Sequence, residues 1–105
     1  MILVVFTAGY KTIGCFRDHP RVRAIQPLEG KHPVLDEPYK SRKNAIAKCA
    51  AAAMSKGYKA FALQDGGLCA SDPLAHKRYG RYGRSSFCKA DGEGGPWSNQ
   101  VYIFQ

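Results

Sequence analysis

Four cysteines in a chain of 105 residues are the feature that most limits how this protein can fold. They are Cys15, Cys49, Cys69 and Cys88, and no two lie within four residues of each other. This spacing matches neither a set of zinc ligands nor a C-x-x-C redox motif. We therefore expect two disulfides made in an oxidising compartment, with four reduced cysteines in a cytosolic core as the alternative. The spacing leaves all three pairings open.

Length and composition predict a single domain over residues 1–105. Such a chain buries about two-thirds of its unfolded surface, which is enough for one modest core and too little for a multidomain enzyme. The apolar stretch Met1–Ala8 is too short to span a bilayer. It also lacks the basic region and cleavage site of a signal peptide. We expect no membrane span.

The charge balance predicts attraction to polyanions. Sixteen Lys and Arg against eight Asp and Glu give a net charge of +8. Residues 38–64 hold six of the cations and residues 73–90 hold five, and neither stretch contains an acid. Nucleic acid, acidic glycan and anionic lipid would all be attracted to such a chain. A generally basic, well-solvated surface is the alternative.

One helix is expected from Ser41, its N-cap, to Lys56, with Gly57 as the left-handed residue that ends it. Its apolar stripe comprises Ile46, Cys49, Ala50, Ala53 and Met54, at spacings of three and four. Because most of these side chains are small, the helix should lie close against whatever it covers.

Short strands are expected on both sides of this helix. Residues 18–39 carry four prolines and read as a loop, and the DGEGGP segment, residues 91–96, reads as another. The expected strands are Tyr10–Phe16, Tyr58–Gln64, Leu68–Ala70 and Trp97–Phe104, the middle two joined as a hairpin through Asp65-Gly66-Gly67. The prediction is an α+β fold, with a small antiparallel sheet packed against one helix and stapled by two disulfides.

Three groups of residues also form a recognisable pattern. They are an opening (Gly14-Cys15-Phe16, Asp18, Arg23-Ala24-Ile25), a centre (Cys49, residues 57–64 and Cys69) and a close (Ser85–Cys88, Gly94-Gly95, Val101-Tyr102). Over residues 10–104 this pattern resembles the WSC domain, a cysteine-rich extracellular module. The resemblance implies carbohydrate binding or protein–protein recognition at the cell surface.

The chain departs from the family pattern of eight cysteines in a consistent way. Ala53 and Ser71 stand where the second helix cysteine and the second strand cysteine would be, and Ala90 and Glu93 stand where the last two would be. In the family these cysteines pair with each other, so whole bridges are missing and no thiol is orphaned. The resemblance implies that the remaining pairs are Cys15–Cys88 and Cys49–Cys69.

Candidate catalytic groups are scattered. The three histidines, His19, His32 and His76, lie in loop-like segments without a metal-binding or triad spacing. The Asp91-Gly92-Glu93 segment has the wrong acidic spacing for a calcium loop. We expect no enzyme activity, no cofactor and no metal.

The most distinctive segment for ligand binding is HKRYGRYGR, residues 76–84, in which Arg-Tyr-Gly occurs twice. Arginine offers a planar fork to carboxylate, sulfate or phosphate, and tyrosine offers a face on which a sugar ring can stack. The candidate ligand-binding residues are Lys77, Arg78, Tyr79, Arg81, Tyr82, Arg84 and, further on, Trp97. The alternatives are that the aromatic side chains pack on the core and that the arginines are only solvated.

Three classes of function compete. The first is a secreted, non-enzymatic module that binds carbohydrate, with a preference for acidic or sulfated glycans. The second is a cationic defence protein, disfavoured because the helix has a small apolar face, or a module that binds a cell-surface protein. The third is nucleic-acid binding, which fits the charge but is at odds with a disulfide framework.

Overall fold

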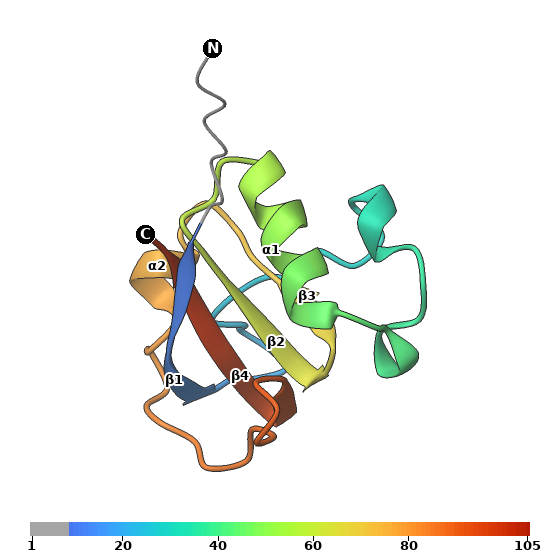
Figure 1. Cartoon of the computed structure of the whole chain (residues 1–105). Coiled ribbons are helices and arrows are strands. Elements are labelled where there is room, and N and C mark those ends of the chain that lie inside the picture. Colours follow the sequence, from blue (N-terminus) through green and yellow to red (C-terminus); the bar gives the residue numbers. More distant parts are fainter. Residues whose placement is uncertain (1–8) are drawn as a thin grey trace.

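The computed structural model describes residues 9–105 and has an α+β architecture, as predicted. One antiparallel sheet has the strand order β1-β4-β2-β3, with α1 packed on one face (Figure 1). The strands are β1 (Tyr10–Arg17), β2 (Ala60–Gly66), β3 (Leu68–Ala70) and β4 (Gly94–Phe104). The helices are α1 (Ala45–Ser55), the single turn α2 (Ala75–Arg78), and the 3-10 turns η1 (Pro33–Leu35) and η2 (Tyr39–Ser41). Within residues 9–105, no helix is both long enough and apolar enough to cross a bilayer.

The sheet is covered on both faces, and β4 shows this directly. Tyr102 and Phe104 belong to the cluster under α1, whereas Val101 and Ile103 belong to the cluster on the opposite face. This is the alternation predicted for a strand with two-residue periodicity. The proline-rich loop fills both clusters: Leu28 and Leu35 pack on the α1 side, and Ala24 and Ile25 on the other.

The start of the helix was predicted wrongly. Ser41 ends η2, and α1 begins four residues later at Ala45. Asn44 precedes α1 with a left-handed φ of 54°, so the backbone is not helical between the two elements. No side chain caps this end of α1.

The end of α1 is as expected. Gly57 has a φ of 74°, and its amide donates to the Met54 carbonyl, while the Tyr58 amide donates to the Ala53 carbonyl. This pair of bonds satisfies the last carbonyls of the helix. Of the predicted stripe, however, Met54 is 45% exposed, and Ala52 is buried instead.

Four strand boundaries also differ from the prediction. β1 ends at Arg17 instead of Phe16, and β2 ends at Gly66, inside the predicted turn, instead of Gln64. β2 begins at Ala60 instead of Tyr58, and β4 begins at Gly94, inside the segment predicted as a glycine-rich loop. A Cβ on Gly94 would lie 2.0 Å from the Leu63 carbonyl oxygen. Gly94 therefore belongs to the sheet because its lack of a side chain lets β4 approach β2.

Both disulfides are formed with the pairing implied by the family resemblance. Cys49–Cys69 joins α1 to β3 with a Cα–Cα distance of 5.2 Å, and both residues are fully buried. Cys15–Cys88 joins β1 to the segment before β4 with a Cα–Cα distance of 6.0 Å. The helix and the long basic segment are thus each tied to the sheet by one covalent bond.

Arg42, one of the cations of the predicted basic surface, is buried. Its guanidinium forms a two-pronged ion pair with Glu29, with N–O distances of 2.8 and 2.6 Å. It also donates to the carbonyls of Gly67, Leu35 and Glu37. The hydrogen bond to Glu29 raises the pKa of Arg42 above its ordinary value, despite the opposing effect of burial. This side chain binds two loops to the β2–β3 hairpin.

Removing either disulfide should destabilise the fold. In the chain-entropy model, Cys49→Ala/Cys69→Ala should lower the free energy of unfolding by about 3 kcal/mol, and Cys15→Ala/Cys88→Ala by about 4 kcal/mol, because the second bridge closes a longer loop. Urea denaturation measures both changes. A loss below about 1 kcal/mol for both variants would contradict this account.

Arg42→Met should lower the free energy of unfolding by about 3 kcal/mol, because it leaves the Glu29 carboxylate and three carbonyls without their partner. The matched control is Lys43→Met, which changes an exposed neighbour and should cost no more than about 0.5 kcal/mol. Equal effects of the two substitutions in urea denaturation would show that the buried ion pair contributes nothing specific.

Candidate functional site

The predicted basic segment covers the free edge of the sheet. Lys77 and Arg78 lie on α2, and the chain then runs alongside β1. The Arg17 amide donates to the Gly83 carbonyl at 2.9 Å, and the Ser85 amide donates to the Cys15 carbonyl at 3.0 Å. An edge strand has unpaired backbone groups, and this segment pairs part of them. Its backbone therefore has a structural role.

The two tyrosines of this segment are half-buried and engaged in packing. Tyr79 lies edge-on against Phe16, with ring centroids 5.0 Å apart. Tyr82 donates its hydroxyl to the Val22 carbonyl and lies beside the His19 ring. The arrangement matches the alternative in which the aromatic rings pack on the core.

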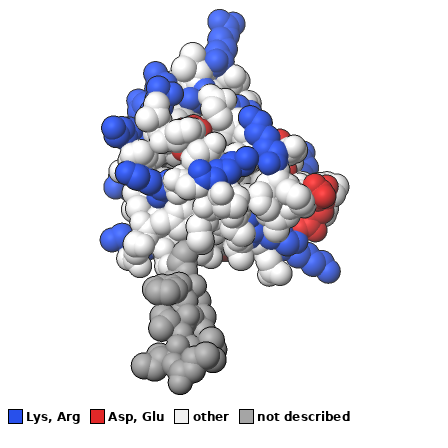
Figure 2. All heavy atoms as spheres, turned by 90° about the horizontal axis from the view of Figure 1, so that it is seen from above, with Lys and Arg blue, Asp and Glu red and all other residues white. Residues whose placement is uncertain are grey.

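The arginines of the segment remain at the surface. Arg81 lies over the Tyr82 ring and Arg84 over the Phe16 ring, at 5.2 and 5.1 Å from the ring centroids. Both are exposed, as are Lys77 and Arg78. Figure 2 shows Lys and Arg side chains spread over the face that it displays, with few acidic side chains among them. The basic side chains thus do not converge on one point of this face.

Trp97 has a different setting. It is 45% exposed at the beginning of β4, with a left-handed φ of 44°. The Arg23 guanidinium lies over its ring, 5.2 Å from the centroid. The Trp97 carbonyl accepts a hydrogen bond from the Asp18 amide at 2.8 Å. Trp97 is therefore held by its backbone while its ring stays accessible.

Three grooves meet at Pro96. The Trp97 groove has a volume of about 240 Å³ and is lined by Arg23, Tyr39, Gln64, Asp65, Leu68, Pro96 and Trp97. The Phe87 groove has a volume of about 400 Å³ and is lined by Lys40, Asp65, Gly66, Phe87, Lys89, Gly94, Gly95 and Pro96. The Ser98 groove has a volume of about 250 Å³ and is lined by Arg17, Asp18, Ser85, Phe87, Pro96, Trp97 and Ser98. Of the sequence-predicted ligand residues, only Trp97 lines these grooves.

Buried polar side chains support the Trp97 groove. The Gln64 amide donates to an Asp18 carboxylate oxygen at 2.7 Å and to the Asn99 side-chain oxygen at 3.0 Å. Arg23 donates to the Gln64 oxygen at 3.2 Å. The second Asp18 oxygen accepts from the Ala24 amide at 2.7 Å, which closes the loop carrying Arg23. The network fixes the guanidinium beside the Trp97 ring.

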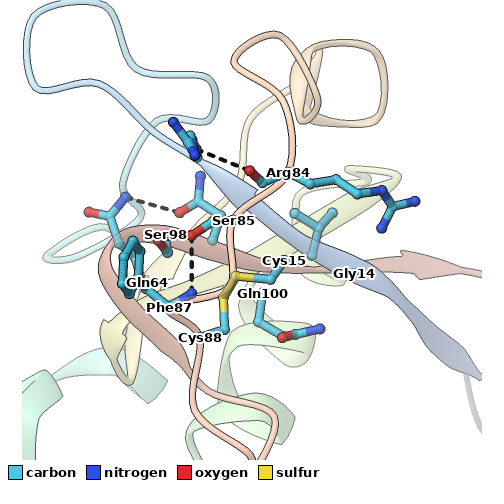
Figure 3. Close-up of a disulfide and its surroundings, with 12 residues drawn as sticks. Gly14, Cys15, Gln64, Arg84, Ser85, Phe87, Cys88, Ser98 and Gln100 are labelled. Atoms are coloured by element: carbon cyan, nitrogen blue, oxygen red, sulfur yellow. Dashed lines mark hydrogen bonds between the residues drawn. A yellow bond between two sulfur atoms is a disulfide. The ribbon is translucent and has the colours of Figure 1, made fainter.

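Phe87 is held as firmly as Trp97, although its side chain is 69% exposed. Its amide donates to the Ser85 hydroxyl at 3.1 Å, and that hydroxyl lies 2.7 Å from the Ser98 hydroxyl (Figure 3). The next residue, Cys88, forms the disulfide to Cys15, so the backbone is anchored on both sides of Phe87. The fold therefore holds the backbone in a position that leaves this ring exposed.

Most residues of this site carry no local sequence signal for ligand binding. Arg23, Gln64 and Phe87 belong to the segments that resemble the WSC pattern, and Pro96 ends the predicted glycine-rich loop, but none of the four is predicted to bind a ligand. These residues come from four separate stretches of the chain, and no local spacing connects them.

Among residues 9–105, no group of three His, Cys, Asp or Glu side chains could hold a metal ion.

The arrangement suits a ligand with both apolar faces and hydroxyl groups. The aromatic rings offer apolar surface, while Tyr39, Asp65 and Arg23, which is held by the buried Gln64, offer hydrogen-bond donors and acceptors within one groove. A scan against models of known protein families finds no match for this chain, and a search of curated proteins finds no significant match.

Gly95→Ala should displace the Phe87 segment, because a Cβ on Gly95 would lie 1.8 Å from the Phe87 carbonyl oxygen. We expect the free energy of unfolding to fall by about 2 kcal/mol or more. The matched control is Gly80→Ala, whose Cβ would meet nothing closer than 3.8 Å. Equal stability of the two variants in urea denaturation would contradict this packing.

Proposed function

We propose that this protein is a non-enzymatic module that binds carbohydrate outside the cell, with Trp97 as the platform on which a sugar ring stacks. The supporting observation is the Trp97 groove, in which an exposed indole lies among the polar side chains of Arg23, Gln64, Tyr39 and Asp65. A pyranose ring has an apolar C–H face and a rim of hydroxyls. It would place the face on the indole and the hydroxyls on the polar groups.

The polar side chains of the groove are pre-organised, which favours binding. Arg23 and Gln64 are fixed by the bonds to Asp18 and Asn99. A tyrosine hydroxyl at the groove, that of Tyr39, donates to the Asp65 carboxylate at 3.1 Å. A ligand would therefore meet groups already ordered, so less conformational entropy is lost on binding.

The extracellular setting is supported by the two disulfides, which persist in oxidising compartments. The resemblance to the WSC domain supports the same setting and the same class of ligand. The net charge of +8 supports a preference for acidic or sulfated glycans. Recognition of a cell-surface protein or of an anionic membrane would use the same charge without requiring the Trp97 groove.

A glycan array, followed by calorimetry on the best ligand, tests this proposal. Trp97→Ala should weaken binding by about 30-fold, the loss of an aromatic hot spot worth about 2 kcal/mol. Arg81→Ala removes an exposed cation of the 76–84 segment that lines none of the three grooves, and it should leave affinity nearly unchanged.

The opposite result would assign ligand binding to another surface of the protein. If Arg81→Ala weakens binding and Trp97→Ala does not, the ligand lies on the basic segment beside β1. Raising the salt concentration should clearly weaken the binding of an acidic ligand, because screening shortens the distance over which the Lys and Arg side chains attract it. Salt-independent binding of the best ligand would contradict the preference for acidic glycans but not the Trp97 site.

A further inference from the structure

We infer that the ligand is an oligosaccharide bound along its chain, and that Phe87 is a second stacking platform for another of its sugar units. This inference rests on the proposed carbohydrate-binding function. It adds that the site has several subsites around Pro96 and contacts more than one sugar unit of the ligand.

The three grooves adjoin one another around Pro96, which lines all of them. The Trp97 groove and the Ser98 groove are both lined by Trp97. The Ser98 groove and the Phe87 groove are both lined by Phe87. The Phe87 groove returns to the Trp97 groove through Asp65, which lines both. A linear ligand stacked on Trp97 would therefore have a neighbouring groove, lined by Phe87, into which its next units could extend.

The size of the grooves favours a long ligand over a compact one. Their volumes, about 240, 250 and 400 Å³, are each near or below the low end of the range for small-molecule pockets, about 300–1,000 Å³. None of them alone would cover a large share of a ligand's surface. The binding free energy would therefore come from contacts in several neighbouring subsites, as in multivalent binding.

The exposure of Phe87, the highest among the large hydrophobic residues that the structure describes, is the observation that best supports a second platform. A phenylalanine with 69% of its surface exposed adds little to a hydrophobic core. Yet its backbone is fixed by the Cys15–Cys88 disulfide, by the Ser85–Ser98 contact and by the close approach of Gly95. Because the backbone is already fixed, a ligand that stacks on this ring would have to order only the side-chain torsions of Phe87.

Hydrogen bonds also connect the backbone segments that carry Phe87 and Trp97. The Ser98 hydroxyl donates to the Pro96 carbonyl at 3.0 Å and contacts the Ser85 hydroxyl, which accepts from the Phe87 amide. Pro96 directly precedes Trp97, so these contacts set the position of one ring relative to the other. Figure 3 shows Ser85, Phe87 and Ser98 grouped beside the disulfide.

The charged groups at Phe87 suit a polar sugar. Lys40, Lys89 and Asp65 line this groove, and the Lys89 ammonium and the Glu93 carboxylate both lie near Gly66. In the described part of the chain, neither lysine belongs to an ion pair. Both ammonium groups are thus available to hydroxyl, carboxylate or sulfate oxygens of a bound unit.

The test uses a length series of the glycan that binds best on the array, from the single sugar to the longest available oligomer. For the intact protein, affinity should rise with length and then level off once the subsites are filled. Phe87→Ala should lower the affinity for the long oligomer by about tenfold and leave that for the shortest binding oligomer unchanged. Trp97→Ala should weaken binding at every length.

The controls separate the two proposals. Val22→Ala changes another exposed apolar side chain, 52% exposed and outside the three grooves, and should change neither affinity. Phe87→Leu keeps an apolar side chain of similar bulk but has no ring, and it replaces Phe87→Ala if that variant does not fold. It should show the same loss of affinity for the long oligomer only. If affinity is independent of length, or if Phe87 variants behave like Val22→Ala, the second platform is refuted and the Trp97 site stands. If the array detects no ligand, or Trp97→Ala has no effect, the carbohydrate site itself is refuted.

Discussion

The attachment of residues 83–88 to the free edge of β1 is the constraint on which the rest of this surface depends. The Cys15–Cys88 disulfide makes the attachment covalent, and two backbone hydrogen bonds set its register. Phe87 then has a fixed position against β4, where Gly95 has no side chain to hold the two backbones apart. A segment without regular structure thus forms one wall of the Phe87 groove and of the Ser98 groove.

Small residues decide how closely the layers approach. On α1, buried alanines and Cys49 face the sheet, so the helix lies near enough for the Cys49–Cys69 bond. At the start of β4, Gly94 does the same between strands. In both places the absence of side-chain volume brings two backbones together, since packed interiors tolerate neither a void nor a clash.

Residue type alone was a poor guide to which cations face solvent. Arg42 lies in the acid-free stretch 38–64, and the pattern predicts an exposed basic side chain, yet Glu29 and three carbonyls surround it in the interior. Tyr79 and Tyr82 lie in a segment that predicts a binding surface, but they pack against Phe16 and His19. The partners that decide these cases are between five and more than sixty residues away in the chain.

The sequence by itself determined the α+β class, the end of the helix at Gly57 and the two-sided character of β4, because these follow from local periodicity and from backbone preferences of single residues. Family resemblance added the disulfide pairing. Only the tertiary structure decided where a ligand could bind. The walls around Pro96 come from five stretches of the chain, within residues 17–23, 39–40, 64–68, 85–89 and 94–98. Their meeting is a consequence of the strand order β1-β4-β2-β3 and of close backbone approach, neither of which leaves a local signature in the chain.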